Sequence, residues 1–181
     1  DRALRGGRAV TFGFRVARPA AAAWNVSKTA LQIGAFWGLL LFVVPAWIAR
    51  LEGAPRYDVP RVLAGALFAA AGCVGLWSGW TMAVRGRGTP LPVDCPARLV
   101  VAGPYAYVRN PMAVAGLTQG VAAALWLGSF WVLAYTAAGG VFWNWVVRPL
   151  EERDLEKRFG ASYDAYRRAV KCWVPRRRAY R

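Results

Sequence analysis

Two adjacent carboxylates, Glu151 and Glu152, follow the last long apolar block of this chain, shortly after Arg148. Carboxylates accept protons and hydrogen bonds, so such a pair can act as a general base or hold a ligand that donates hydrogen bonds. Neighbouring side chains on a helix point in different directions, and we therefore expect the two to have different partners. The alternative for Glu152 is a surface ion pair with Arg148 at i,i+4, which contributes only ~0.3–0.5 kcal/mol.

A second group of candidate residues ends the long loop 85–110, which is rich in glycine and proline. Asn110 and Pro111 predict a helix start, because Asn is a favoured N-cap and Pro is favoured at the first helical position. The N-terminus of a helix presents unpaired N–H groups, and Arg109 beside it strengthens the attraction for an anionic ligand group. The alternative for Arg109 is a basic anchor at the membrane surface.

Two tyrosines, Tyr105 and Tyr107, precede this helix start. Gly103 and Pro104 predict a turn that aims them. Their rings suit contact with an adenine ring or a sulfonium cation. As aromatic residues at a membrane interface they would need no ligand at all.

Residues that are absent exclude several kinds of site. The chain has no histidine, which rules out a two-histidine metal centre and a Ser-His-Asp triad. Cys73, Cys95 and Cys172 form no CxxC pair and are odd in number, so neither a disulfide framework nor a zinc site is indicated. We predict no metal.

Long apolar blocks must position these residues. Hydrophobic types make up 57% of the 181 residues, above the ~45–50% of soluble domains. A membrane span needs about 20 apolar residues, and the shortest are about 17. Pro45 is expected to kink the first span, and Gly128-Ser129 to join the last two as a tight hairpin. We predict an all-α polytopic integral membrane bundle of about four transmembrane helices, at about 29–49, 62–84, 111–127 and 130–147.

Charge predicts the orientation of this bundle. The net charge is +15, and the arginines flank the apolar blocks, which favours anionic lipid over nucleic acid as the partner. Basic residues dominate the N-terminal tail, the loop 85–110 and the C-terminal tail. Both termini and that loop are therefore expected in the cytoplasm, with the protein in a bacterial inner membrane.

The tails on either side of the spans complete a single predicted domain, 1–181. In the segment 1–28, Phe12, Phe14 and the run 20–24 predict a short interfacial helix. The segment 148–181 is expected to form a cytoplasmic amphipathic helical region that Gly160 interrupts. Its apolar stripe at helical spacing is Leu155, Phe159, Tyr163 and Tyr166.

Two motifs in these segments resemble a known superfamily. The loop sequence GRGTPLP…LVVAGPYAYVRNPM and the tail EERDLEKRFGASYDAYRRAV…WVP are similar to signatures of bacterial members of the isoprenylcysteine carboxyl methyltransferase and phospholipid methyltransferase superfamily. The two motifs occur in the expected order and span about half the chain. The resemblance implies an S-adenosylmethionine-dependent membrane methyltransferase that acts on a lipid or a prenylated (isoprenoid) substrate.

The resemblance also assigns roles to individual residues. Arg109 and Glu151 are expected to be catalytic, and Arg109 and Arg148 to bind substrate. Asn110 stands where the isoprenylcysteine enzymes usually have a histidine, and it resembles the phospholipid-type branch. Two positions depart from the usual motif: Ala113 replaces a tyrosine and Ala106 a basic residue. The expected cofactor-binding residues are Gly103, Pro104, Tyr105, Tyr107, Asn110, Pro111, Glu151 and Glu152.

The methylated atom stays open at this level. A carboxylate substrate could be oriented by Arg109 or Arg148, whereas an amine needs a base, for which Glu151 and Glu152 are the nearby candidates. A lipid tail would enter sideways between the spans. The alternatives are an NADPH-dependent sterol-reductase-like enzyme and a non-catalytic membrane protein of the same fold, and the sequence indicates no oligomeric state.

Overall fold

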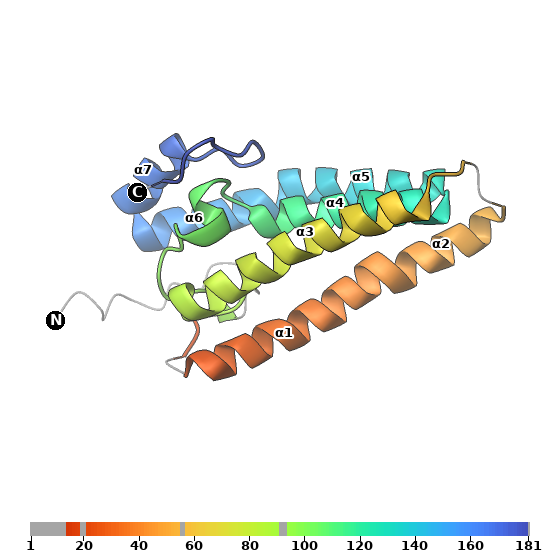
Figure 1. Ribbon diagram of the computed structural model, residues 1–181. Coiled ribbons are helices and arrows are strands. Elements are labelled where there is room, and N and C mark those ends of the chain that lie inside the picture. The colour runs from red at the N-terminus through yellow and green to blue at the C-terminus, as the bar shows by residue number, and fades with distance from the viewer. Residues whose placement is uncertain (1–13, 19–20, 55–56, 91–93, 181) are drawn as a thin grey trace.

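The described part of the chain is helical. The computed structural model describes residues 14–18, 21–54, 57–90 and 94–180, and long helices lying side by side dominate it (Figure 1). Extended backbone pairs in these ranges only at an isolated bridge between Val16 and Cys95. The predicted all-α class is therefore confirmed.

The first long helix runs from Ala22 to Glu52, through α1 (Ala22–Gly38), the π-helical turn η1 (Leu39–Val43) and α2 (Val44–Glu52). It begins seven residues before the predicted span, so the predicted separate interfacial helix is wrong where it is described: Ala22–Trp24 is the first turn of α1. Phe12 lies outside the described residues. The helix continues through Pro45, which is the second residue of α2 and lies two positions after the end of the π-helical turn.

The next two helices form the centre of the bundle. Helix α3 (Arg61–Thr81) continues into the π-helical turn η2 (Met82–Gly86), and α4 (Pro111–Leu127) has the predicted bounds. Gly128 adopts a left-handed conformation (φ +61°) and Ser129 caps the following helix through its side chain, which confirms the tight hairpin.

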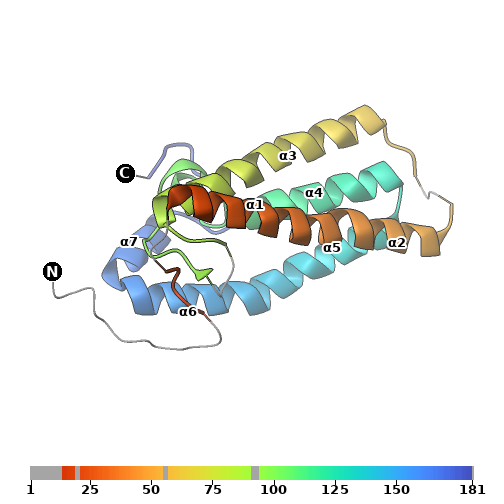
Figure 2. The ribbon, with the colours of Figure 1, turned by 90° about the horizontal axis from the view of Figure 1, so that it is seen from below.

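The last long helix extends well past its predicted end at Val147. Helix α5 (Phe130–Phe142) passes through the π-helical turn η5 (Trp143–Val147) directly into α6 (Arg148–Phe159). Gly160, at φ +48°, ends it as predicted, and α7 (Ala161–Ala169) folds back (Figure 2). The two glutamates therefore stand on the same continuous helix as the last apolar block.

Three of the helices are long and apolar enough to cross a membrane: Ala22–Glu52, Arg61–Gly86 and Phe130–Phe159. Helix α4 is apolar but only 17 residues long, below the usual ~20. Three membrane-spanning helices are thus consistent with the prediction, and a crossing by α4 stays a prediction.

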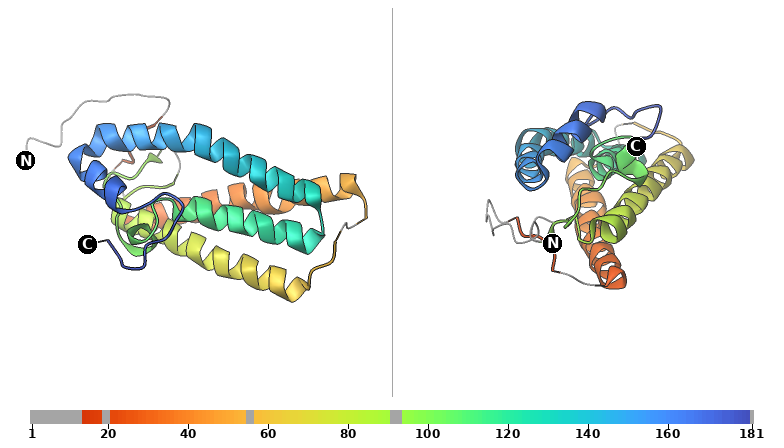
Figure 3. Two further views of the ribbon diagram at one scale, coloured as in Figure 1. Left: turned by 90° about the horizontal axis from the view of Figure 1, so that it is seen from above. Right: turned by 90° about the vertical axis from the view of Figure 1, so that its left-hand side faces the viewer.

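Small residues let the helices approach closely. A Cβ on Gly116 of α4 would lie 2.2 Å from the Trp37 ring of α1, and one on Gly120 would lie 2.7 Å from the Thr136 side chain of α5. Gly75 of α3 faces the Ala115 Cβ of α4. Such contacts supply the packing that membrane helices need, and helix α4 accordingly lies between α3 and α5, with η1 and α2 of the first long helix also against it (Figure 3).

One end of the bundle carries most of the polar structure. The loop between η2 and α4, helix α6, helix α7 and the C-terminal segment gather there, close to the start of α1 (Figures 1 and 3). We call this the loop end.

Candidate active site

A tight turn begins the part of the loop that holds the candidate residues. Gly103 adopts φ +58° and opens the 3-10 turn η4 (Gly103–Ala106), with Pro104 at its second position. A Cβ on Gly103 would lie 2.8 Å from the Thr81 hydroxyl oxygen. The turn is therefore pressed against the end of α3, and only glycine satisfies both the conformation and the contact.

An ion pair links this loop to α6. The Arg109 Nη1 atom lies 3.0 Å from Glu152 Oε1 and donates a hydrogen bond to the Tyr163 hydroxyl at 3.2 Å. The Arg148 Nη1 atom is 4.0 Å from the same Glu152 oxygen. The shorter contact crosses between elements, so the surface i,i+4 pair is the weaker of the two interactions of Glu152.

The two candidate tyrosines of the loop have different environments. The side chain of Tyr105 is buried, whereas Tyr107 is 39% exposed. The Tyr166 hydroxyl of α7 donates a hydrogen bond of 2.7 Å to the Tyr105 carbonyl, which fixes the turn against α7. Only Tyr105 therefore points into the interior of the loop end.

The C-terminal segment closes over the loop, which the sequence did not predict. The Arg109 N–H donates to the Lys171 carbonyl at 3.1 Å, and the N–H groups of Arg176 and Tyr180 donate to loop carbonyls at 2.9 Å each. These are single backbone contacts without the periodicity of a helix or strand. The apolar run around Trp173, whose indole donates to Asn144 Oδ1, is the only sequence signal of this docking.

Asn110 stands at the predicted helix start and contacts the C-terminal segment through its side chain. It occupies the N-cap position of α4, with Pro111 at the first helical position, but its side chain makes no capping hydrogen bond. Its Nδ2 atom instead donates to Cys172 Sγ at 3.3 Å. The predicted helix start is therefore confirmed, but the Asn110 side chain bonds to the C-terminal segment and not to the first N–H groups of α4.

Burial governs the ionisation of the tyrosines around this ion pair. Burial and the nearby Glu152 carboxylate raise the pKa of Tyr163 to about 12, although Arg109 opposes the shift. Burial also raises the pKa of Tyr105 and of Tyr166 above the usual value. All three hydroxyls consequently stay protonated at neutral pH and are available as hydrogen-bond donors.

Several buried polar atoms here have no hydrogen-bond partner. They include the Tyr105 hydroxyl, Arg109 Nε and Glu152 Oε1, and the contact of Glu152 Oε1 with Arg109 is an ion pair without hydrogen-bond geometry. Leaving a buried polar group unpaired costs about 1–3 kcal/mol. In the described part of the chain the Glu151 carboxylate likewise meets no cation or donor, although the side chain is partly buried. The loop end thus offers unused donors and acceptors to a ligand.

Comparison with protein families identifies this region. The model of the phospholipid methyltransferase family matches residues 59–162, more than half of the 181-residue chain. The chain belongs to the phospholipid methyltransferase family. The resemblance read from the two motifs is therefore confirmed. Neither the curated proteins nor the solved structures contain a match to the chain.

The phospholipid methyltransferase match covers part of the structure. It takes in α3, the loop, α4, α5, α6 and the first residues of α7, and with them every predicted site residue. Helices α1 and α2 and the C-terminal segment that closes the loop lie outside it. Membership indicates a membrane methyltransferase.

Proposed function

We propose that this protein transfers a methyl group from S-adenosylmethionine to a membrane lipid. The observation that carries this proposal is a set of buried polar atoms without a hydrogen-bond partner, at Tyr105, Arg109 and Glu152, all inside the segment that matches the family. S-adenosylmethionine has an ammonium, a carboxylate and ribose hydroxyls, which need such donors and acceptors.

These residues fit the cofactor by their chemistry. The Glu152 carboxylate accepts hydrogen bonds from its ammonium or hydroxyl groups, and Tyr105 and Arg109 donate. When bound, the cofactor supplies an electrophilic methyl group on a sulfonium centre. Methyl transfer of this kind depends mainly on alignment, so a site without histidine is chemically sufficient.

Glu151 is the proposed proton acceptor. It lies beside Glu152 but forms no ion pair with a described residue, so its carboxylate is free to hold the proton that a lipid amine loses on methylation. The family match favours a phospholipid amine over a carboxylate as the methylated group. For a carboxylate, Arg148 at the same helix exit is the proposed orienting cation.

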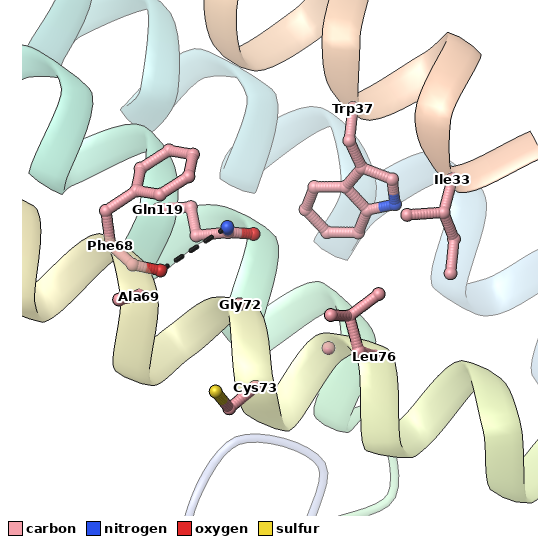
Figure 4. Close-up of a pocket in the computed structure, with 9 residues that line it drawn as sticks. Ile33, Trp37, Phe68, Ala69, Gly72, Cys73, Leu76 and Gln119 are labelled. Carbon is pink, nitrogen blue, oxygen red and sulfur yellow. Dashed lines mark hydrogen bonds between the residues drawn. The ribbon is translucent and has the colours of Figure 1, made fainter. Parts of the chain in front are cut away.

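A hollow in the bundle suits the tail of such a lipid. It has a volume of about 310 Å³ and lies between α1, α3 and α4, lined by Trp37, Phe68, Leu76 and the glycine face of α3 (Figure 4). The one polar side chain in its wall is Gln119, whose amide is directed to the Phe68 carbonyl. An acyl or isoprenoid chain matches this apolar lining.

Two measurements test the proposal together. Calorimetric titration of the purified protein in detergent is expected to show saturable binding of S-adenosylhomocysteine. Incubation with labelled S-adenosylmethionine and a bacterial lipid extract is expected to yield a labelled lipid that mass spectrometry identifies. Absence of S-adenosylhomocysteine binding together with tight NADPH binding would overturn the proposal in favour of a reductase.

A further inference from the structure

Helix α1 carries a row of polar side chains with buried atoms that no described residue satisfies. Asn25 is 1% exposed and Thr29 is 3% exposed, in a helix that is otherwise apolar over most of its length. Neither amide atom of Asn25 has a hydrogen-bond partner, and the same holds for Thr29 Oγ1 and Gln32 Oε1. We call Asn25, Thr29 and Gln32 the polar row.

The polar row lies on one face of α1. Residues four apart on a helix are neighbours, so Asn25 and Thr29 stand one above the other, with Gln32 adjoining. The Thr29 methyl group lies 3.3 Å from the position of a Cβ on Gly79, which places this face against α3. Lys28, on the same turn, forms an ion pair with Asp94 of the loop. The row therefore lies between α1 and α3 at the loop end.

The same face of α1 leads into the apolar hollow. Ile33 and Trp37 follow Thr29 at successive spacings of four residues, and both line the hollow (Figure 4). From Asn25 to Trp37 the face extends about 18 Å at 1.5 Å per residue. The half of this face at the loop end is polar and the other half is apolar. A surface that binds an amphipathic lipid along its length needs the same division.

We infer that the polar row binds the hydrogen-bond-donating group of the lipid substrate while the tail occupies the hollow. Three of the four unpaired atoms are oxygens, so the row accepts hydrogen bonds from an N–H or O–H group. Buried polar atoms that stay unpaired in the absence of ligand are costly, and pairing them on binding recovers that cost. This inference rests on the proposed function and assigns lipid recognition to α1, outside the family match.

Thermal unfolding of the full-length protein in detergent, with added lipid, tests the inference without requiring catalysis. The probes are dioleoyl lipids with an amine donor (phosphatidylethanolamine), a hydroxyl donor (diacylglycerol) or no headgroup donor (phosphatidylcholine). The two donor lipids distinguish which group the row accepts. We expect at least one of them to raise the Tm more than phosphatidylcholine does.

Two variants with closely similar side-chain shapes, Asn25→Leu and Thr29→Val, are expected to abolish that difference between lipids. The loss of a hydrogen bond of this kind corresponds to about a 5- to 10-fold weaker apparent affinity for the donor lipid. The matched control is Ser27→Ala on the exposed side of the same helix, where the hydroxyl only donates to the Ala23 carbonyl. This control should keep the wild-type lipid preference.

The structural alternative predicts a different result. If the row only stabilises the fold, both variants lower the Tm without lipid and keep the wild-type preference among the three lipids, which overturns the inference. Equal Tm shifts with all three lipids in the wild type overturn it as well. Binding of S-adenosylhomocysteine is measured in the same samples. Absence of this binding in the wild-type protein would refute the proposed function. Unchanged binding in variants that have lost the lipid preference would support lipid recognition by the polar row.

Discussion

The loop end and the middle of the bundle use different interactions to hold their elements together. At the loop end, an ion pair, tyrosine hydroxyls and backbone hydrogen bonds join the loop 103–111 to α6, α7 and the C-terminal segment. In the middle, glycine and alanine allow α1, α3, α4 and α5 to pack closely with few polar contacts. Specific polar partners hold the first region and complementary shape holds the second, so the two should respond to different perturbations.

The difference also bears on function. A region held by pairs of polar groups can exchange a pair for a ligand, because its donors and acceptors are already placed. A region held by shape offers space instead, and here that space is an apolar hollow. In the proposed enzyme, the polar loop end therefore binds the cofactor and the apolar hollow binds the lipid tail.

Removal of one charge from the loop end is expected to have the largest effect. Glu152→Gln leaves the partly buried Arg109 without its counterion, which should destabilise the protein by about 3 kcal/mol and reduce the affinity for S-adenosylhomocysteine more than tenfold. Denaturant unfolding and calorimetry measure the two effects. The control Glu156→Gln changes a glutamate on the same helix that is 49% exposed, and it should leave both values close to wild type.

Alkaline pH should weaken the loop end selectively. Because the pKa of Tyr163 rises from 10.0 unfolded to about 12 folded, stability is complete below pH 10 and falls between pH 10 and about 12. The loss is at most about 3 kcal/mol by linkage. Unfolding free energies across this pH range should show a shallower decline in Tyr163→Phe, but not in Tyr107→Phe. Equal slopes in wild type and Tyr163→Phe would contradict the assigned burial.

Overfilling the bundle tests the region held by shape. Gly116→Ala forces the Trp37 ring to move and should destabilise the protein by about 1–3 kcal/mol, without changing S-adenosylhomocysteine binding. Gly139→Ala on α5 meets open space, so the higher helix propensity of alanine should leave stability unchanged or raise it by up to about 1 kcal/mol. A gain in stability in both variants would show that helix propensity, rather than packing, dominates here.

The smallest expected effect is the loss of one hydroxyl between the loop and α7. Tyr166→Phe removes the 2.7 Å hydrogen bond to the Tyr105 carbonyl and should cost about 1 kcal/mol. Faster hydrogen exchange at the amides of residues 103–109, with unchanged exchange in α3 and α4, would locate the effect at the loop end. Uniformly faster exchange would mean that the two regions unfold together.

Much of the fold could be predicted from the sequence because it depends on local patterns. Apolar block length predicts membrane helices, Gly128-Ser129 predicts the hairpin, and Gly160 predicts the end of α6. The motifs in the loop and the tail led to the correct superfamily. The helix start at Ala22 and the unbroken passage of the last span into α6 were not predicted, because helices extend past the apolar core wherever the flanking residues tolerate helical backbone.

Sequence alone determined the helical class, the membrane character and the two segments that carry the family motifs, since each follows from residue type and short-range spacing. Tertiary structure decided which of those residues meet. It paired Arg109 with Glu152 and placed the C-terminal segment over the loop. It also gave the Asn110 side chain a hydrogen bond to Cys172 in place of a capping hydrogen bond. It also revealed that the polar row on α1 lacks hydrogen-bond partners, because the partners of a polar residue in an apolar helix depend on which residues the fold places beside it.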